Sequence, residues 1–118
     1  MYGLPINFDA NIFLGRQIES ITYASNVIVI SLDLGITFSV ESSLDYLPVG
    51  VESNLTDAFP LTSTRLITFI GNVIIKAIIV EQKDIMLFFE GNSWIAIKDD
   101  SKYYESYKIK IGETEIVV

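Results

Sequence analysis

The chain has 118 residues, half of them hydrophobic, and a formal net charge of −7 from 15 acids and eight bases. This length suits one domain with a single core, and the apolar content is too high for a disordered chain. The acidic balance disfavours nucleic-acid binding, which requires a basic surface. We therefore expect a single domain over residues 1–118.

No membrane span or secretion signal is predicted. The most apolar stretch, residues 66–80, is interrupted by Asn72 and Lys76 and falls short of the roughly 18 uninterrupted apolar residues that a span needs. The opening residues lack the basic and apolar regions of a signal peptide. Because the chain also has no cysteine, which is compatible with a reducing compartment, we expect a cytoplasmic protein without a membrane partner.

The first predicted elements form a three-stranded antiparallel meander over residues 17–24, 27–33 and 36–41. Apolar and polar residues alternate in the second and third of these segments, as expected of half-buried strands. Gly35 supplies the turn between them, because glycine readily adopts a positive φ.

Residues 42–60 predict a long, polar and acidic loop, broken by Pro48, Gly50 and Pro60. Residues 1–64 hold seven acids and one base, hence a charge of −6, which attracts a basic partner or only keeps the domain soluble. Acidic and aromatic side chains together suit a basic protein surface. The candidate partner-binding residues are therefore Glu41, Asp45, Tyr46, Glu52 and Asp57. The alternative is a solvated connection with buried leucines.

A short helix is predicted over residues 61–71. Thr62 or Ser63 can cap its N-terminus, Leu66 and Ile70 would share one face, and Gly71 suits the position after the last turn. Threonine and isoleucine, which recur in this segment, are poor helix formers.

The second half repeats the pattern of the first, with strands predicted over residues 72–81, 85–90 and 94–98. The two halves match at an offset of 56 residues, which becomes 57 after one extra residue. At these offsets Leu14-Gly15 matches Ile70-Gly71, Ile18 matches Ile74, and Ile28, Ile30, Leu32, Phe38 and Val40 match Ile85, Leu87, Phe89, Ile95 and Ile97. We expect a structural repeat with halves of about 14–43 and 70–100, chance alternation being the alternative.

The fold class expected from these elements is mainly β, or β-rich α+β. A C-terminal hairpin over residues 106–118, turning at Gly112-Glu113, completes the two meanders and the one short helix. Continuous apolar runs such as residues 77–80 indicate strands that are covered on both faces. Two packed sheets would cover them, and so would a homodimer.

The residues for most catalytic chemistry are missing, because the chain has neither histidine nor cysteine. This excludes Ser-His-Asp and Cys-His nucleophile systems, acid–base catalysis by histidine and the usual zinc sites. No glycine-rich nucleotide-binding motif is present either. Asp99, Asp100 and Glu105 are the densest carboxylate cluster, for which a calcium site, a carboxylate hydrolase and a solvated turn are the alternatives. We predict no catalytic, cofactor-binding or metal-binding residue and no enzyme.

Two further features have a structural and a functional interpretation. Trp94, Tyr103, Tyr104 and Tyr107 would form a binding platform for carbohydrate or protein, or they fill the core, which is the commoner use of such residues. Arg16, the only base among residues 1–64, is expected to pair with a neighbouring acid.

Several short segments resemble a family of small bacterial proteins of unknown function. They are the opening Met-Tyr-Gly-Leu-Pro, Leu14-Gly15-Arg16, Ile70-Gly71 and the ending Tyr104-Glu105-Ser106-Tyr107-Lys108-Ile109 with Ile116-Val117-Val118. Many proteins of this size and type lie beside toxin genes and look like immunity proteins of interbacterial toxin systems. The resemblance implies an immunity protein that neutralises a toxin by direct binding between its acidic surface and a basic one. The alternative is a homo-oligomeric structural or regulatory protein.

Overall fold

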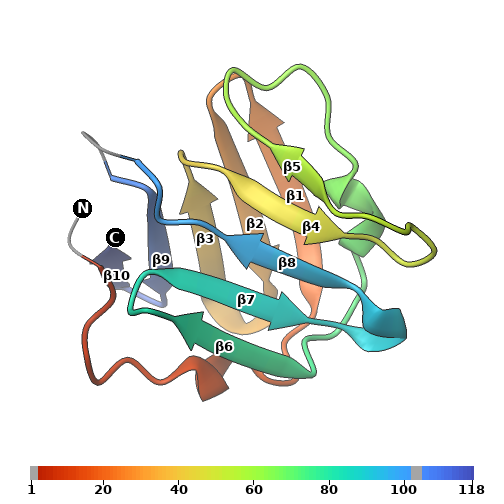
Figure 1. Ribbon diagram of the computed structural model, residues 1–118. Coiled ribbons are helices and arrows are strands. Elements are labelled where there is room, and N and C mark those ends of the chain that lie inside the picture. The colour runs from red at the N-terminus through yellow and green to blue at the C-terminus, as the bar shows by residue number, and fades with distance from the viewer. Residues whose placement is uncertain (1–2, 102–104) are drawn as a thin grey trace.

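The computed structural model describes residues 3–101 and 105–118. This part of the chain forms ten strands, in which apolar and polar residues alternate (Figure 1). The strands are β1 (Ile18–Ala24), β2 (Val27–Leu32), β3 (Ile36–Val40), β4 (Leu44–Leu47), β5 (Leu55–Asp57), β6 (Lys76–Val80), β7 (Asp84–Phe88), β8 (Trp94–Ile97), β9 (Tyr107–Ile111) and β10 (Thr114–Val117). Four single-turn 3-10 helices accompany them: η1 (Ala10–Phe13), η2 (Asp33–Gly35), η3 (Leu66–Phe69) and η4 (Glu90–Asn92). The prediction of a mainly β fold is confirmed.

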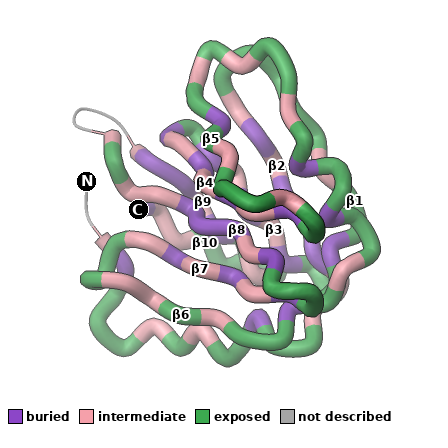
Figure 2. The backbone as a smooth tube through the Cα atoms, turned by 45° about the vertical axis from the view of Figure 1, so that its right-hand side comes forward, coloured by how far each residue is buried: buried purple, intermediate pink, exposed green. Residues whose placement is uncertain are grey.

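The strands form two antiparallel sheets that pack face to face. The first sheet has the order β1-β2-β3-β9-β10 and the second the order β5-β4-β8-β7-β6. In Figure 1 the strands of the second sheet lie in front and cross those of the first sheet steeply. Buried residues concentrate between the two layers (Figure 2). Packing of the two sheets therefore covers the inner face of each, whereas outward residues such as Ile78 of β6 stay exposed.

The core follows from the two-residue period of the strands. Ile28, Ile30 and Leu32 of β2 are buried, whereas the residues between them are half-buried on the outer side. Aromatic rings pack against one another in the core. The Phe13 and Phe38 ring centroids lie 5.1 Å apart, and those of Phe69 and Phe89 lie 5.2 Å apart.

Both predicted meanders are confirmed, and the turns inside them match as well. β1, β2 and β3 pair in sequence, and so do β6, β7 and β8. Leu34 and Gly35 of η2 have φ of 59° and 75°, and Gly91 and Asn92 at the equivalent place in η4 have φ of 77° and 60°. The two halves thus share even an unusual pair of left-handed residues.

Each half of the chain contributes one hairpin, β4-β5 or β9-β10, to the sheet formed by the meander of the other half. β3 pairs with β9, so that Phe38 lies opposite Ile109, and β8 pairs with β4, so that Ile95 lies opposite Tyr46. The 3-10 helices are exchanged too, because η1 contacts β6 and η3 contacts β1. Each sheet therefore takes three strands from one half of the chain and two from the other.

A short antiparallel ladder marks the axis that relates the two halves. The Gly15 N–H donates to the Ile74 carbonyl (2.9 Å), and at the equivalent place the Gly71 N–H donates to the Ile18 carbonyl (2.8 Å). Gln17 pairs with Val73, the residue at its own equivalent position. A pseudo-twofold axis therefore passes between Gln17 and Val73.

Residues 42–60, predicted to be mainly a loop, contain two short strands that the sequence did not predict, β4 and β5. Leu44 and Tyr46 are buried, whereas Asp45 and Leu47 on the other side are half-buried. β4 lies between β5 and β8, so its backbone groups are paired on both edges despite the acidic composition.

The helix predicted over residues 61–71 is only the single 3-10 turn η3. Its N-cap is Arg65, whose side chain forms no capping hydrogen bond, and the Thr64 hydroxyl accepts the Leu66 N–H (3.1 Å). Phe69 rather than Ile70 joins Leu66 in the core, because a 3-10 helix repeats every three residues. No helix in the described part of the chain is long and apolar enough to cross a membrane.

The predicted C-terminal hairpin is confirmed. β9 and β10 pair across a two-residue connection, and Gly112 at its start has a φ of 59°. Glycine adopts this backbone conformation without the strain that a side chain would bring.

If each sheet requires a hairpin from the other half, neither half should fold alone. We expect the separate fragments 1–62 and 63–118, cut between the exposed residues Thr62 and Ser63, to lack a strand signal in far-ultraviolet circular dichroism. Their equimolar mixture should regain it, because each fragment supplies the hairpin that the other lacks. A cooperative unfolding transition of either fragment alone would contradict the required exchange.

Candidate binding surface

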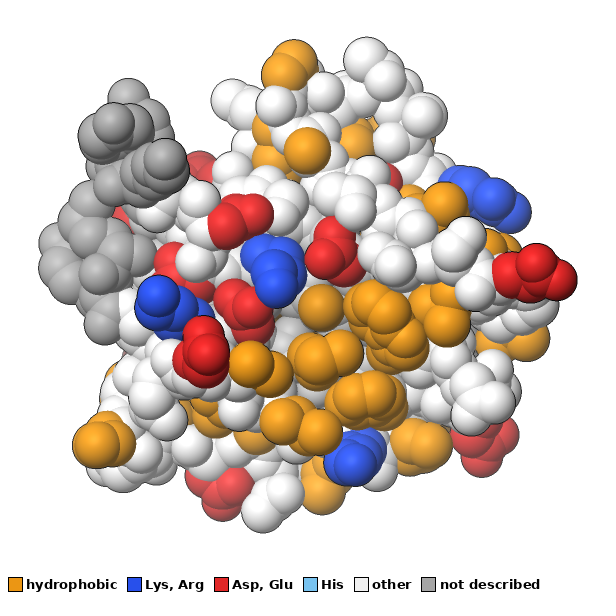
Figure 3. All heavy atoms as spheres, in the orientation of Figure 1, with side chains coloured by type: hydrophobic (Ala, Val, Ile, Leu, Met, Phe, Trp, Pro, Cys, Tyr) orange, Lys and Arg blue, Asp and Glu red, His pale blue; other side chains and the backbone are white. Residues whose placement is uncertain are grey.

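The outer faces of the two sheets differ in chemistry although their backbones correspond. Along equivalent positions the first sheet carries Thr22, Val29, Ser31, Thr37, Ser39 and Lys110, and the second carries Ile78, Met86, Phe88, Trp94, Ala96 and Leu47. We call the second set the apolar face. In Figure 3 hydrophobic side chains gather over β4, β6, β7 and β8 in one continuous area.

The apolar face is not required by the fold, because the same backbone in the first sheet tolerates polar residues. Ser31 and Phe88, like Thr37 and Trp94, are half-buried on the outer side of their sheets. Single exposed apolar residues are common on proteins, but a contiguous apolar area with a polar rim is typical of an interaction site. The second sheet therefore carries the better candidate surface.

The charges at the rim of the apolar face are partly neutralised within the chain. The Lys98 ammonium lies 2.8 Å from the Asp84 carboxylate, and this hydrogen bond is the main reason why the pKa of Lys98 is raised. The Asp45 carboxylate accepts a hydrogen bond from the Thr56 hydroxyl (2.7 Å). The Lys76 ammonium lies 5.5 Å from the centre of the Phe88 ring, within reach of a cation–π contact.

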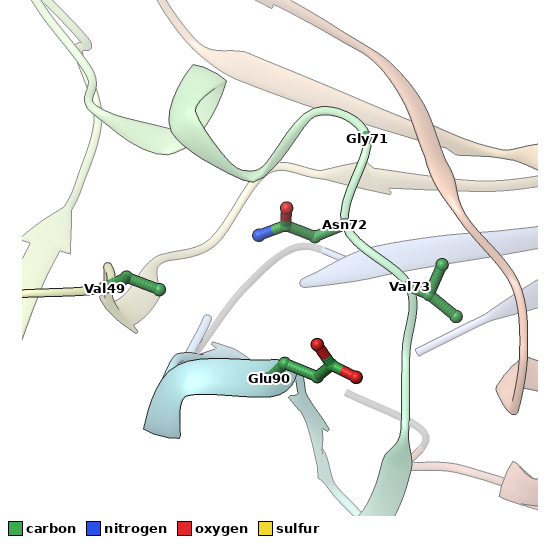
Figure 4. Close-up of a pocket in the computed structure, with 5 residues that line it drawn as sticks. All are labelled: Val49, Gly71, Asn72, Val73 and Glu90. Carbon is green, nitrogen blue, oxygen red and sulfur yellow. The ribbon is translucent and has the colours of Figure 1, made fainter.

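A pocket of 280 Å³ lies at one end of the apolar face, lined by Val49, Gly71, Asn72, Val73 and Glu90. These residues come from the connection between β4 and β5, the segment between η3 and β6, and η4. The Asn72 and Glu90 side chains point into the space between these segments (Figure 4). The pocket therefore combines a carboxylate and an amide with apolar walls.

Two of the predicted partner-binding residues, Tyr46 and Asp57, are buried, so the prediction that they contact a partner is wrong. The Tyr46 hydroxyl donates to Asp57 Oδ1 (2.9 Å), the Thr64 hydroxyl donates to the second oxygen, and the Arg65 N–H donates to the Tyr46 oxygen (3.0 Å). Burial is the largest cause of the raised pKa of Tyr46. Both residues stabilise the packing of β4 and β5 against η3.

The other three predicted residues lie on the surface but do not form one cluster. Glu41 and Glu52 are exposed at opposite ends of β4, and Asp45 is half-buried within the strand, beside the apolar face. Their role in binding stays a prediction. Sequence reasoning missed Phe88 and named Trp94 only as a member of an aromatic cluster, although comparing outward residues at the offset of 57 would have shown the contrast with Ser31 and Thr37.

The carboxylate cluster near residue 100 serves the connections between the sheets. Asp99 Oδ1 accepts a hydrogen bond from the Ser106 hydroxyl (2.6 Å), and Asp100 Oδ2 accepts one from the Ser43 hydroxyl (2.5 Å). Within the ranges that the structure describes, no group of three or more acidic residues is arranged to hold a metal ion.

The predicted aromatic cluster is divided between the surface and the core. Tyr107 is buried, and its hydroxyl donates to the Lys83 carbonyl (2.6 Å). Trp94 belongs to the apolar face. Tyr103 and Tyr104 lie outside the described residues.

No family model, curated protein or solved structure matches this chain. The resemblance to small bacterial proteins and to immunity proteins therefore stays a prediction. The apolar face and the pocket beside it are the features from which a function must be inferred.

We expect Tyr46→Phe to lower the free energy of unfolding by about 1–3 kcal/mol, because it removes a donor from the buried Asp57 carboxylate. Urea denaturation measures the change. Tyr23→Phe is the matched control, because Tyr23 is 51% exposed and should change stability by less than about 0.5 kcal/mol. Equal stability of the two variants would contradict a structural role for the Tyr46–Asp57 pair.

Proposed function

We propose that the protein is a non-catalytic binding protein that covers a surface of another protein with its apolar face. The observation that carries this proposal is the contrast between two equivalent sheet faces, of which one is mainly polar and the other mainly apolar. Selection for stability alone gives no reason for this difference, because both faces occupy the outside of the same fold.

The composition of the apolar face supports this proposal. Trp94 and Phe88 are aromatic anchors of the kind that dominate binding energy at protein interfaces. Met86 adds a flexible apolar side chain that adapts to a partner. Around this centre lie charged residues such as Asp45, Lys76 and Lys98, and a polar rim around an apolar core is the usual anatomy of an interface.

The binding that we propose is inhibitory: neutralisation of a cognate toxin in the cytoplasm by direct contact. An inhibitor of this kind needs no catalytic group, only a surface that fits its target. The net charge of −7 supports a basic target, because opposite charges accelerate encounter. The lack of cysteine is compatible with the reducing cytoplasm.

Self-association through the apolar face is the second candidate. A homodimer would bury this surface on both copies, and a twofold axis would place it against itself. The same observation, an apolar face without cover in the described chain, favours this alternative. The mass of the purified protein in solution separates the two, since the inhibitor is expected to be monomeric until its target is added.

The test compares two double variants, one on each outer face. Phe88→Ser with Trp94→Thr gives the apolar face the residues that Ser31 and Thr37 supply at the equivalent positions, so the variant should fold. With a partner purified from the native host, we expect its affinity to fall at least about 100-fold, since two interface hot spots contribute about 2 kcal/mol or more each. Titration calorimetry measures the dissociation constants.

The matched control is Ser31→Ala with Thr37→Ser on the first sheet, which should bind within about twofold of the natural chain, because surface changes away from an interface have small effects. Equal affinities of the two double variants would refute binding through the apolar face. A dimeric natural chain that becomes monomeric in the Phe88→Ser, Trp94→Thr variant would establish self-association in its place.

A further inference from the structure

The two halves of the chain differ at one pair of equivalent charged positions. In the first half the Arg16 guanidinium lies 3.5 Å from the Asp33 carboxylate, which confirms the expected pairing of Arg16. The other Asp33 oxygen accepts the Gln17 N–H (2.9 Å). In the second half the equivalent residues are Asn72, which follows Gly71 as Arg16 follows Gly15, and Glu90, which begins η4 as Asp33 begins η2.

The second half thus keeps the acid and lacks the base. Glu90 is exposed, and its carboxylate forms no ion pair with any residue in the described ranges. The pocket of 280 Å³ lies between Glu90 and Asn72, the residue that replaces the arginine. Arg65 lines an adjoining hollow that shares Val49 and Asn72, not the pocket itself.

The lining of this pocket suits one long cationic side chain. Glu90 supplies a carboxylate, Asn72 supplies an amide oxygen, and the apolar walls formed by Val49 and Val73 fit the methylene groups of the stem. The Gly71 carbonyl accepts the Gln17 side-chain amide (2.9 Å) and has a second lone pair. A guanidinium carries five N–H donors in a planar fork, so it can bind a carboxylate and neighbouring carbonyl oxygens at once.

We propose that this pocket receives an arginine side chain of the partner protein, in the place where the first half uses its own Arg16. The inference rests on the proposed function, because the pocket adjoins the apolar face. Val49 lies two residues after Leu47, and Glu90 lies two residues after Phe88. An arginine that projects from an apolar surface of the partner would enter the pocket while that surface covers the apolar face.

The test uses the isolated protein and a blocked arginine, N-acetyl-arginine N-methylamide, as the probe. In a nuclear magnetic resonance titration of the ¹⁵N-labelled chain, we expect saturable shifts of the amides of Gly71, Asn72, Val73, Glu90 and Gly91. A single exposed ion pair binds weakly, so the dissociation constant should be on the order of 1–10 mM. Blocked lysine should bind less tightly, and blocked citrulline, which has the same shape without the charge, should cause no saturable shift.

Two variants and a control separate this pocket from the general negative charge of the protein. Glu90→Gln removes the carboxylate, and Asn72→Arg restores the arrangement of Arg16 and Asp33, so either should abolish the shifts. Glu52→Gln removes an exposed acid that does not line the pocket and should leave the titration unchanged. Thermal unfolding of each variant verifies that it is folded.

Shifts of the same size in the Glu90→Gln variant, or no shifts with the natural chain, would overturn the proposal. Blocked lysine that binds as tightly as blocked arginine would overturn the assignment to arginine. None of these results bears on the apolar face, because the Phe88→Ser, Trp94→Thr variant tests that face with the partner itself. Conversely, if the apolar face is found not to bind a partner, the response of the isolated chain to blocked arginine can still be measured.

Discussion

Neither half of this chain contains a complete sheet, and the rest of the structure follows from this constraint. β3 needs β9 and β8 needs β4, so the two halves must exchange hairpins before either sheet has its five strands. The ladder between residues 15–18 and 71–74 holds the halves about a pseudo-twofold axis. Equivalent residues of the two halves therefore occupy corresponding backbone positions, so the backbone alone does not dictate a chemical difference between them.

Two such differences between the halves concern the outer face of the sheet and the acid beside that face. The outer face of the first sheet is polar, and its neighbouring acid Asp33 is paired with Arg16. The outer face of the second sheet is apolar, and its neighbouring acid Glu90 has no ion pair in the described chain. In the first half, charge and polarity are satisfied by the chain and by water. In the second half neither is satisfied within the described chain, and for this reason we propose that one partner surface supplies both contacts.

The meanders are predictable from the sequence, because the alternation of apolar residues such as Ile28 and Ile30 with the residues between them is a property of each strand alone. Such local patterns did not reveal β4, whose alternation covers only four residues amid acids and turn formers. The hairpin exchange was also not predictable, because no local pattern states which distant strand pairs with β3. The same lack of a pattern explains the prediction of Tyr46 as a binding residue in a loop, although its place on the inward side of β4 makes it a core residue.

The exchanged hairpins also determine when the protein can fold during synthesis. β3 leaves the ribosome early, but its second edge has no partner until residues 107–111 follow. Pairings between such distant segments are slow to form, and an unpaired strand edge beside apolar side chains invites association with other chains. The first sheet can therefore be completed only after nearly the whole domain has been made, and until then the second edge of β3 stays open to pairing with other chains.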